Sequence, residues 1–308
     1  MRVALYGAGQ VSRNIARILA TRADVEVIGP AGREQRLEML ASGADVVVIA
    51  TTSFLADVAG HIRLAAESGT NVITSAEEAA FPWAVDASLA EELDGLARER
   101  GVTILGGGLN PGFAFDALVV TALGPAAHVR SIRVERIVDC SGFGTNILRR
   151  IGFGFSETEF EAGTKSGAIT GHIGFPQSMN VVAGALGLTI DRIEREITPI
   201  IGDRRYEVEH LTVEAGRTAG FEQHYVAIVD GAPWFEALFT AHLEPESIGK
   251  PARDEIWIDG TPDLHFVVIP GFNPQSASSA LIANSLRRVV DAKPGWTTVA
   301  ALPPAFPH

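Results

Sequence analysis

The glycines at positions 7 and 9 have the spacing of a dinucleotide-binding turn. In MRVALYGAGQVSRNIARILA a short apolar run precedes them and a helical pattern of apolar residues follows. We expect Gly7 to permit a tight turn and Gly9 to let the backbone approach a pyrophosphate. Gln10 and Val11 then open a helix whose N–H groups face the phosphates. The alternative is a strand-to-helix turn in another kind of α/β protein, because Ser12 replaces the third glycine of the usual motif.

The end of the second expected strand lacks the acid that usually holds the ribose of NAD. Dinucleotide sites place this carboxylate about twenty positions past the glycines, where this chain has Gly29, Pro30 and Ala31. Arg33, with Arg36 nearby, could instead pair with a 2′-phosphate. The sequence therefore predicts NADP as the preferred cofactor and NAD as a second candidate. The alternative is that both arginines face solvent at the start of a helix.

Polar residues follow the third and fourth expected strands. Ligands of open parallel sheets bind beyond the carboxyl ends of the strands, so this is the edge at which cofactor and substrate would lie. Glu78 could hold an ammonium group or relay a proton. The alternative is that Glu78 or its neighbour starts a helix, where an acid suits the helix dipole. The cofactor contacts predicted at this edge are Thr51, Thr52, Ser75 and Glu77.

Three consecutive glycines and an Asn-Pro-Gly turn follow the fifth expected strand, in GGGLNPGFAFD at 106–116. Glycine lets the backbone approach a ligand closely, so Gly108 is included among the predicted cofactor contacts. We expect Asn110 beside the nicotinamide, where an amide can orient a substrate but cannot titrate. A purely structural turn is the alternative.

His172 is the main candidate for proton transfer, in the glycine-rich segment SGAITGHIGFPQS. Histidine takes up and releases protons most readily near neutral pH. The alternative is a histidine whose hydrogen bonds are satisfied by nearby backbone. Weaker polar candidates are Lys165, His210, Glu214 and His224.

These residues need a frame of alternating strands and helices, and the first part of the chain has that pattern. Short apolar runs at 3–6, 25–28, 46–50, 72–74 and 102–105 are separated by helical segments near 10–20, 33–42, 54–68 and 86–100. Such alternation implies right-handed crossovers and a buried parallel sheet. We predict an α/β, doubly wound Rossmann domain at 1–124 that is joined by a C-terminal helix within 270–308.

After Gly124 the pattern changes to strands that follow one another directly, with one expected over 206–213. Turns such as AGRTAG and VDGAP join them, which favours a largely antiparallel open sheet. One helix is expected from Ser156, where SETE offers a capping box, and another after Pro176. We predict an α+β domain at 125–269.

Composition excludes several classes of protein. The 308 residues are 46% hydrophobic and 20% charged, which is typical of an ordered globular protein. The net charge of −12 and the lack of a dense Lys/Arg run argue against a nucleic-acid partner. No apolar run reaches the ~18 residues that span a bilayer, so we expect no membrane partner and a cytoplasmic location. A single cysteine, Cys140, excludes an internal disulfide framework and a cysteine zinc cluster, and no metal is expected.

Six segments in order resemble the 2,4-diaminopentanoate dehydrogenase and native amine dehydrogenase family, which is related to dihydrodipicolinate reductase. They are GAGQVS, TSAEEAAFPW, GGGLNPGFAFD, TGHIGFPQSM, VEAGRTAG and SSALIANSLRRVVDAKPGWTTVAALP. The resemblance implies NAD(P)-dependent oxidative deamination or reductive amination by a homodimer, with substrate and dimer contacts in the second domain. The chain departs from the family in two places: the loop after the second strand is short, and 106–112 lacks the cleft glutamate of such amine dehydrogenases.

Together these features predict an NAD(P)H-dependent oxidoreductase that acts on a C–N bond. A hydride would pass between the nicotinamide and an imine carbon, and a small ketone or oxo-acid would exchange with ammonia for an amine or diamino acid. Asn110, His172 and Glu78 are predicted to meet around the nicotinamide as the catalytic group. Two alternatives stay open: an NADPH-dependent ketone or cyclic-imine reductase that needs no ammonia, and a non-catalytic NADP-binding sensor.

Overall fold

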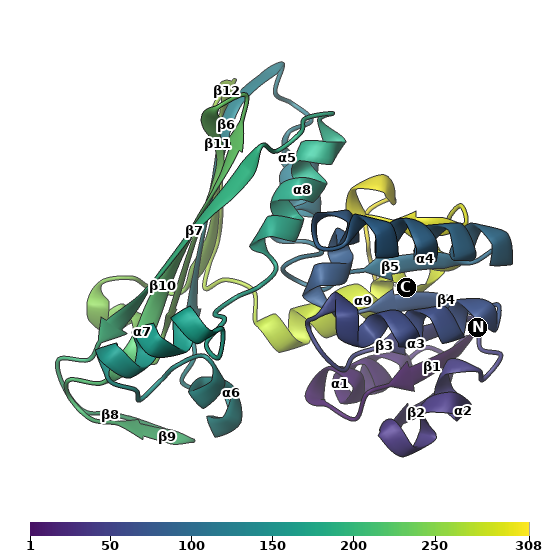
Figure 1. Ribbon diagram of the computed structural model, residues 1–308, viewed down its shortest axis with the longest axis horizontal. Coiled ribbons are helices and arrows are strands. Elements are labelled where there is room, and N and C mark those ends of the chain that lie inside the picture. Colours follow the sequence, from purple (N-terminus) through teal and green to yellow (C-terminus); the bar gives the residue numbers. More distant parts are fainter. Residues whose placement is uncertain (308) are drawn as a thin grey trace. The chain divides into compact units, whose positions relative to one another are not determined.

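The computed structural model describes residues 1–307 (Figure 1). It contains two compact units. Unit 1 consists of Met1–Thr121, Gly174–Thr189 and the segment from Asn273 onward, and unit 2 of Ala122–Ile173 and Ile190–Phe272. The chain thus leaves unit 1, returns for sixteen residues, and leaves again. The segment 174–189, which the sequence assigned to the second domain, belongs to unit 1.

Unit 1 is built on a six-stranded parallel sheet with the order β14-β5-β4-β3-β1-β2. From β1 the chain crosses to β2 on one side and then to β3 on the other side. The order therefore reverses between β1 and β3, which is where open α/β sheets bind ligands. The strands are β1 Arg2–Tyr6, β2 Glu26–Ala31, β3 Val46–Ile49, β4 Asn71–Thr74, β5 Thr103–Gly106 and β14 Gly295–Thr297.

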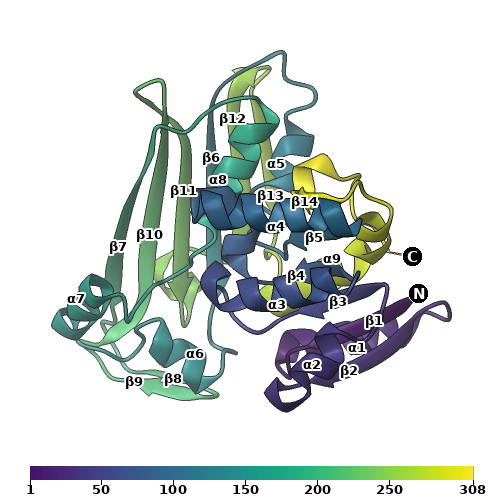
Figure 2. The ribbon, with the colours of Figure 1, turned by 45° about the vertical axis from the view of Figure 1, so that its right-hand side comes forward.

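Helices cover both faces of this sheet because neighbouring strand residues point to opposite sides. Val3 and Leu5 enter a core with α1 and α9, whereas Ala4 and Tyr6 enter a second core with α2, α3 and α4. Figures 1 and 2 show α3 and α4 on one side of the sheet and α9 on the other. The helices are α1 Gln10–Leu19, α2 Arg36–Leu40, α3 Leu55–Glu67, α4 Ala87–Arg100, α5 Ala117–Ala122, α8 Phe175–Ala185 and α9 Pro274–Val290, with short 3-10 helices η1 Arg33–Gln35, η2 Glu77–Ala80, η3 Pro82–Ala84 and η5 Val299–Ala301.

Unit 2 is built on a six-stranded sheet with the order β13-β12-β6-β11-β10-β7. Its neighbouring strands are antiparallel apart from β6 and β11, which are parallel. The predicted α/β fold with a second, largely antiparallel domain is therefore confirmed. The strands are β6 His128–Asp139, β7 Arg192–Ile201, β10 Thr218–Val229, β11 Ala232–His242, β12 Arg253–Thr261 and β13 Leu264–Val268.

Shorter elements complete unit 2. The strand expected over 206–213 is instead a hairpin of β8 Tyr206–Val208 and β9 Leu211–Val213, because Glu209 and His210 form a turn. Helix α7, Glu157–Ser166, begins with the predicted capping box of Ser156 and Glu159. The remaining elements are α6 Thr145–Arg150 and the 3-10 helix η4 Pro245–Ile248.

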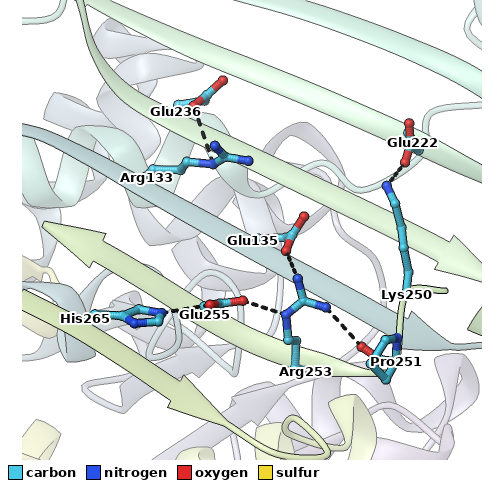
Figure 3. Close-up of polar contacts among 9 residues, drawn as sticks. All are labelled: Arg133, Glu135, Glu222, Glu236, Lys250, Pro251, Arg253, Glu255 and His265. Atoms are coloured by element: carbon cyan, nitrogen blue, oxygen red, sulfur yellow. Dashed lines mark hydrogen bonds and ion pairs between the residues drawn. The ribbon is translucent and has the colours of Figure 1, made fainter. Parts of the chain in front are cut away.

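One face of the unit 2 sheet carries paired charges (Figure 3). Arg253 contacts both Glu135 and Glu255, and Glu255 also accepts a hydrogen bond from His265. On the opposite face the side chain of Arg136 donates to Asp254 over 2.7 Å, and both side chains are 4% exposed. The sheet is thus fixed across β6 and β12 by polar pairs on both faces. Among residues 1–307 no helix combines the length and apolar character needed to cross a lipid bilayer.

Candidate functional site

A cavity of about 950 Å³ lies beside the Gly7–Gly9 turn in unit 1. Its wall comprises this turn, the segment after β2, the end of β3 and one side of α3. It therefore lies where the strand order reverses. Its volume is within the range of small-molecule and cofactor sites.

The glycine turn has the conformation that a pyrophosphate site needs. Gly7 has φ +129°, and a Cβ there would lie 2.2 Å from the carbonyl oxygen of Ala50. At Gly9 a Cβ would meet no atom within 4 Å. Gly9 is the N-cap of α1, no side chain caps this helix, and its first turn contains no acid. The open N-terminus of α1 therefore fits an anionic group.

One side chain of α1 stabilises the glycine turn. The side chain of Arg13 donates to the carbonyl oxygen of Ala8 over 2.6 Å and so braces the loop from the first turn of α1. Ser12, in the place of the third motif glycine, is fully buried, and its hydroxyl has no partner among the described residues. The predicted contacts Gln10 and Val11 are the first two residues of α1.

Two arginines border the cavity after β2. Arg33, in η1, and Arg36, at the start of α2, are both exposed, and neither forms an ion pair within residues 1–307. Two guanidinium groups without ion-pair partners suit a phosphate. Glu34 also borders the cavity, and sequence analysis missed it.

Two residues of α3 that the sequence did not predict, Asp57 and His61, also border the cavity. The predicted contacts Thr51 and Thr52 border the same cavity, and the hydroxyl of Thr52 donates to the carboxylate of Asp57 over 3.1 Å. Asp57 and His61 are one helical turn apart and both face the cavity, and the His61 ring packs edge-on against Tyr6 with 5.0 Å between ring centroids. Burial, and then the charge of Arg36, lower the pKa of His61. The i, i+4 spacing of Asp57 and His61 was the available sequence signal.

Five predicted cofactor contacts do not border this cavity: Gln10 and Val11 of α1, and Ser75, Glu77 and Gly108. The backbone N–H of Ser75 donates to Ile49 over 3.0 Å as part of the sheet. Glu77 accepts hydrogen bonds from the Ser53 hydroxyl over 2.9 Å and from the backbone N–H of Gly174 over 3.0 Å. Gly108 borders a separate small cavity of about 50 Å³.

Glu78 has a structural role in unit 1. Its carboxylate accepts a hydrogen bond of 2.7 Å from the backbone N–H of Leu55, the first residue of α3, which no side chain of its N-cap satisfies. A carboxylate at this position also suits the helix dipole. Glu77 is the first residue of η2. The alternative interpretation, in which these acids serve helix starts, therefore describes the local geometry, and the catalytic role of Glu78 stays a prediction.

Asn110 lies in a buried polar network that sequence analysis only partly anticipated. The Ser178 hydroxyl lies 3.2 Å from Asn110 Oδ1 and 3.0 Å from Asp116 Oδ2. Asp116 also accepts backbone hydrogen bonds of 2.6 Å from Gly112 and from Ala117. Burial raises the pKa of Asp116 to about 6, although these three hydrogen bonds act in the opposite direction.

Helix α8 brings Ser178 to this loop. Gly174, which precedes α8, packs so closely that a Cβ there would lie 2.1 Å from Cδ of Pro111. The rings of Phe115 and Phe175 stack with 5.9 Å between centroids. The loop at 106–116 and the start of α8 are thus one packed feature of unit 1, although some sixty residues separate them in sequence.

His172 belongs to unit 2, where its backbone is fixed by β10. Its N–H donates to the side chain of Gln223 over 2.9 Å, and its carbonyl oxygen accepts from Gln223 and from the Tyr225 hydroxyl, each over 3.1 Å. The ring lies 5.3 Å from that of Phe239. Asn110 and Glu78 belong to unit 1, and the meeting of all three around a nicotinamide stays a prediction.

The weaker candidates are surface residues of unit 2. Lys165 lies 3.8 Å from Glu161 on α7, and His224 forms a hydrogen bond of 2.8 Å with Glu236. His210 and Glu214 are exposed near β9. Within residues 1–307 no group of three or more His, Cys, Asp or Glu side chains is arranged to hold a metal ion.

Comparison with known proteins identifies the family. The model of the 2,4-diaminopentanoate dehydrogenase C-terminal domain matches residues 113–307. The chain is 30% identical over 329 aligned positions to 2,4-diaminopentanoate dehydrogenase of Acetoanaerobium sticklandii, which covers 98% of this chain and 93% of that protein.

Solved structures share the fold. Amine dehydrogenase from Mycobacterium smegmatis has a TM-score of 0.85 at 22% identity. The aligned region covers 99% of this chain and 97% of the amine dehydrogenase chain. Biliverdin reductase from Synechocystis sp. PCC 6803, solved with biliverdin and NADP+, has a TM-score of 0.52 at 14% identity. The aligned region covers 94% of this chain and 89% of the biliverdin reductase chain. The resemblance found in the sequence is confirmed, and the chain belongs to the 2,4-diaminopentanoate dehydrogenase family.

Proposed function

We propose that this protein is an NAD(P)-dependent amine dehydrogenase. The observation that carries the proposal is the 30% identity to a 2,4-diaminopentanoate dehydrogenase over 98% of the chain. In the deaminating direction an amine, water and oxidised cofactor give a carbonyl compound, ammonia, reduced cofactor and a proton. A 2,4-diamino acid is the first substrate to test, and small ketones or oxo-acids with ammonia are the substrates of the reverse reaction.

The cavity of unit 1 suits the cofactor. The Gly7–Gly9 turn and the open start of α1 would hold the pyrophosphate, and Thr51 and Thr52 border the path along the strand ends. A bound nicotinamide supplies or accepts the hydride. We propose NADP as the preferred form because Arg33 and Arg36 have no ion-pair partners among the described residues. Ser75, Glu77 and Gly108 stay proposed contacts for the nicotinamide half.

The proton transfers need a group that titrates. Ammonia must add to the carbonyl carbon and water must leave before hydride arrives, and both steps move protons. Asn110 can orient a reactant but carries no titrating proton. We therefore assign the transfers to His172 or Glu78. The 125–269 region would bind the organic part of the substrate and form a homodimer, and the cytoplasm is the proposed location.

An ammonia titration tests this function. At fixed ketone and NADPH, we expect the oxidation of NADPH to require ammonia and to saturate with it, and we expect an amine as the product. The measurement follows nicotinamide absorbance and identifies the product by mass spectrometry. A rate independent of ammonia with an alcohol as product would identify a ketone reductase instead. Cofactor binding without turnover over a broad carbonyl panel would identify a sensor.

A further inference from the structure

The buried network around Ser178 points to two positioning residues for Asn110. We propose that Asp116, acting through the Ser178 hydroxyl, sets which end of the Asn110 side-chain amide is directed away from the loop. This inference rests on the proposed function, in which Asn110 contacts the reactants. Neither Asp116 nor Ser178 contacts a reactant in this scheme.

The geometry places two acceptors around one hydroxyl hydrogen. Ser178 Oγ lies 3.0 Å from Asp116 Oδ2 and 3.2 Å from Asn110 Oδ1, and the side chains of Ser178 and Asp116 are fully buried. A serine hydroxyl has one hydrogen to donate and can also accept. It therefore donates to only one of these two oxygens. The Nδ2 group of Asn110 is buried and has no partner within residues 1–307.

Two hydrogen-bond arrangements satisfy these three side chains. When Asp116 is ionised, the hydroxyl hydrogen goes to the carboxylate, because a charge-assisted hydrogen bond is the stronger one. Ser178 Oγ must then accept, so Asn110 turns its NH₂ group inward and its carbonyl oxygen outward. When Asp116 is protonated, it donates to Ser178, Ser178 donates to Asn110 Oδ1, and the NH₂ group is directed outward.

Burial is the largest influence on the pKa of Asp116, ahead of its hydrogen bonds. Helices α5 and α8 contain no ionisable side chain, and the loop at 106–115 contains none. Arg288 of α9 borders the same small cavity as Gly112, and burial alone lowers its pKa. The pKa of Asp116, raised to about 6, places the exchange between the two arrangements inside the range in which enzymes are assayed.

The ionised arrangement suits the proposed chemistry. A substrate ammonium or iminium group offers N–H donors and needs an acceptor, which the outward carbonyl oxygen of Asn110 provides. Below about pH 6 the outward NH₂ group would face those donors instead. Amine binding should therefore weaken as Asp116 becomes protonated. The amine itself cannot cause this change, because aliphatic amines stay protonated throughout this pH range.

Selective ¹⁵N labelling of asparagine tests the link without any turnover. The chain has seven asparagines, and Asn110→Ala identifies the side-chain signal of Asn110. We expect this NH₂ signal to shift with a midpoint near pH 6 in the wild type. The shift should disappear in Ser178→Ala and persist in the matched control Ser279→Ala, a fully buried serine of α9 whose hydroxyl donates to the carbonyl oxygen of Gln275 over 2.7 Å. An absent midpoint in the wild type, or an undiminished shift in Ser178→Ala, would overturn the proposal.

Amine binding tests the consequence. For 2,4-diaminopentanoate, KM should rise about tenfold as the pH falls from 7 to 5 in the wild type, the effect of losing one hydrogen bond to a charged group. In Ser178→Ala, KM should be raised at both pH values and should no longer depend on pH. Ser178→Thr, which keeps the hydroxyl, should restore the wild-type profile if Ser178→Ala unfolds. If folded Ser178→Ala keeps the wild-type pH dependence of KM, the proposal about Asp116 and Ser178 is wrong. If no amine is turned over, the proposed function is wrong, and the ¹⁵N experiment still tests the proposal about Asp116 and Ser178.

Discussion

Replacing Gly7 by alanine is expected to destabilise unit 1 by about 3–5 kcal/mol, which is the range of severe single substitutions. The backbone at Gly7 has φ +129°, which side chains other than hydrogen rarely adopt, and the new Cβ would lie 2.2 Å from the Ala50 carbonyl oxygen. Because Ala50 directly follows β3, relief of this contact would separate β1 from β3. Thermal unfolding without cofactor should show a fall in Tm of about 10 °C.

Gly9→Ala is the matched control for this experiment. A Cβ at Gly9 meets no atom within 4 Å, and its φ of −77° suits any residue. We expect Tm without cofactor to stay at the wild-type value. The methyl group would, however, occupy the space through which a pyrophosphate approaches the start of α1, so cofactor affinity should fall about 10- to 100-fold. Wild-type affinity in Gly9→Ala would place the pyrophosphate elsewhere, and a wild-type Tm in Gly7→Ala would refute the argument from backbone strain.

The sequence predicted unit 1 well because its signals are local. The strands over 2–6, 46–49, 71–74 and 103–106 are short apolar runs, and burial on both faces of a parallel sheet requires such runs. The glycine turn was predictable for the same reason, since both glycines and the start of α1 lie within five residues. In unit 2 the hairpin of β8 and β9 was missed because Glu209 and His210 carry no glycine or proline turn signal.

Long-range packing could not be predicted from local patterns. The buried network joins Asn110 and Asp116 to Ser178, and α8 reaches them only because the chain returns to unit 1 at Gly174. In sequence, Ser178 is one of several small residues after Pro176, and nothing marks it as a partner for a buried acid. Glu78 shows the same limit, because its bond to the start of α3 spans 23 residues.

The cofactor preference has a local signal, but the structure adds an opposing one. Arg33 and Glu34 are neighbours on the wall of the same cavity. A guanidinium favours the 2′-phosphate of NADP, whereas a carboxylate accepts from the 2′-hydroxyl of NAD and repels a phosphate. Preference therefore depends on which side chain faces the adenosine ribose. The two residues can be separated by single substitutions, since both are exposed and neither forms an ion pair within the described chain.

Arg33→Ala is expected to weaken NADPH binding about 10- to 100-fold and to leave NADH binding within about twofold, because the lost charge-assisted pair exists only with the 2′-phosphate. Glu34→Ala should act in the opposite direction, tightening NADPH and weakening NADH. Dissociation constants for both cofactors, measured by the fluorescence of the reduced nicotinamide, decide the matter. The NADPH effect should shrink at high salt, since Arg33 is exposed and its field is screened. If Arg33→Ala weakens both cofactors equally, Arg33 does not read the 2′-phosphate, and the absence of an acid at Gly29 to Ala31 would then reflect the short loop rather than a choice of NADP.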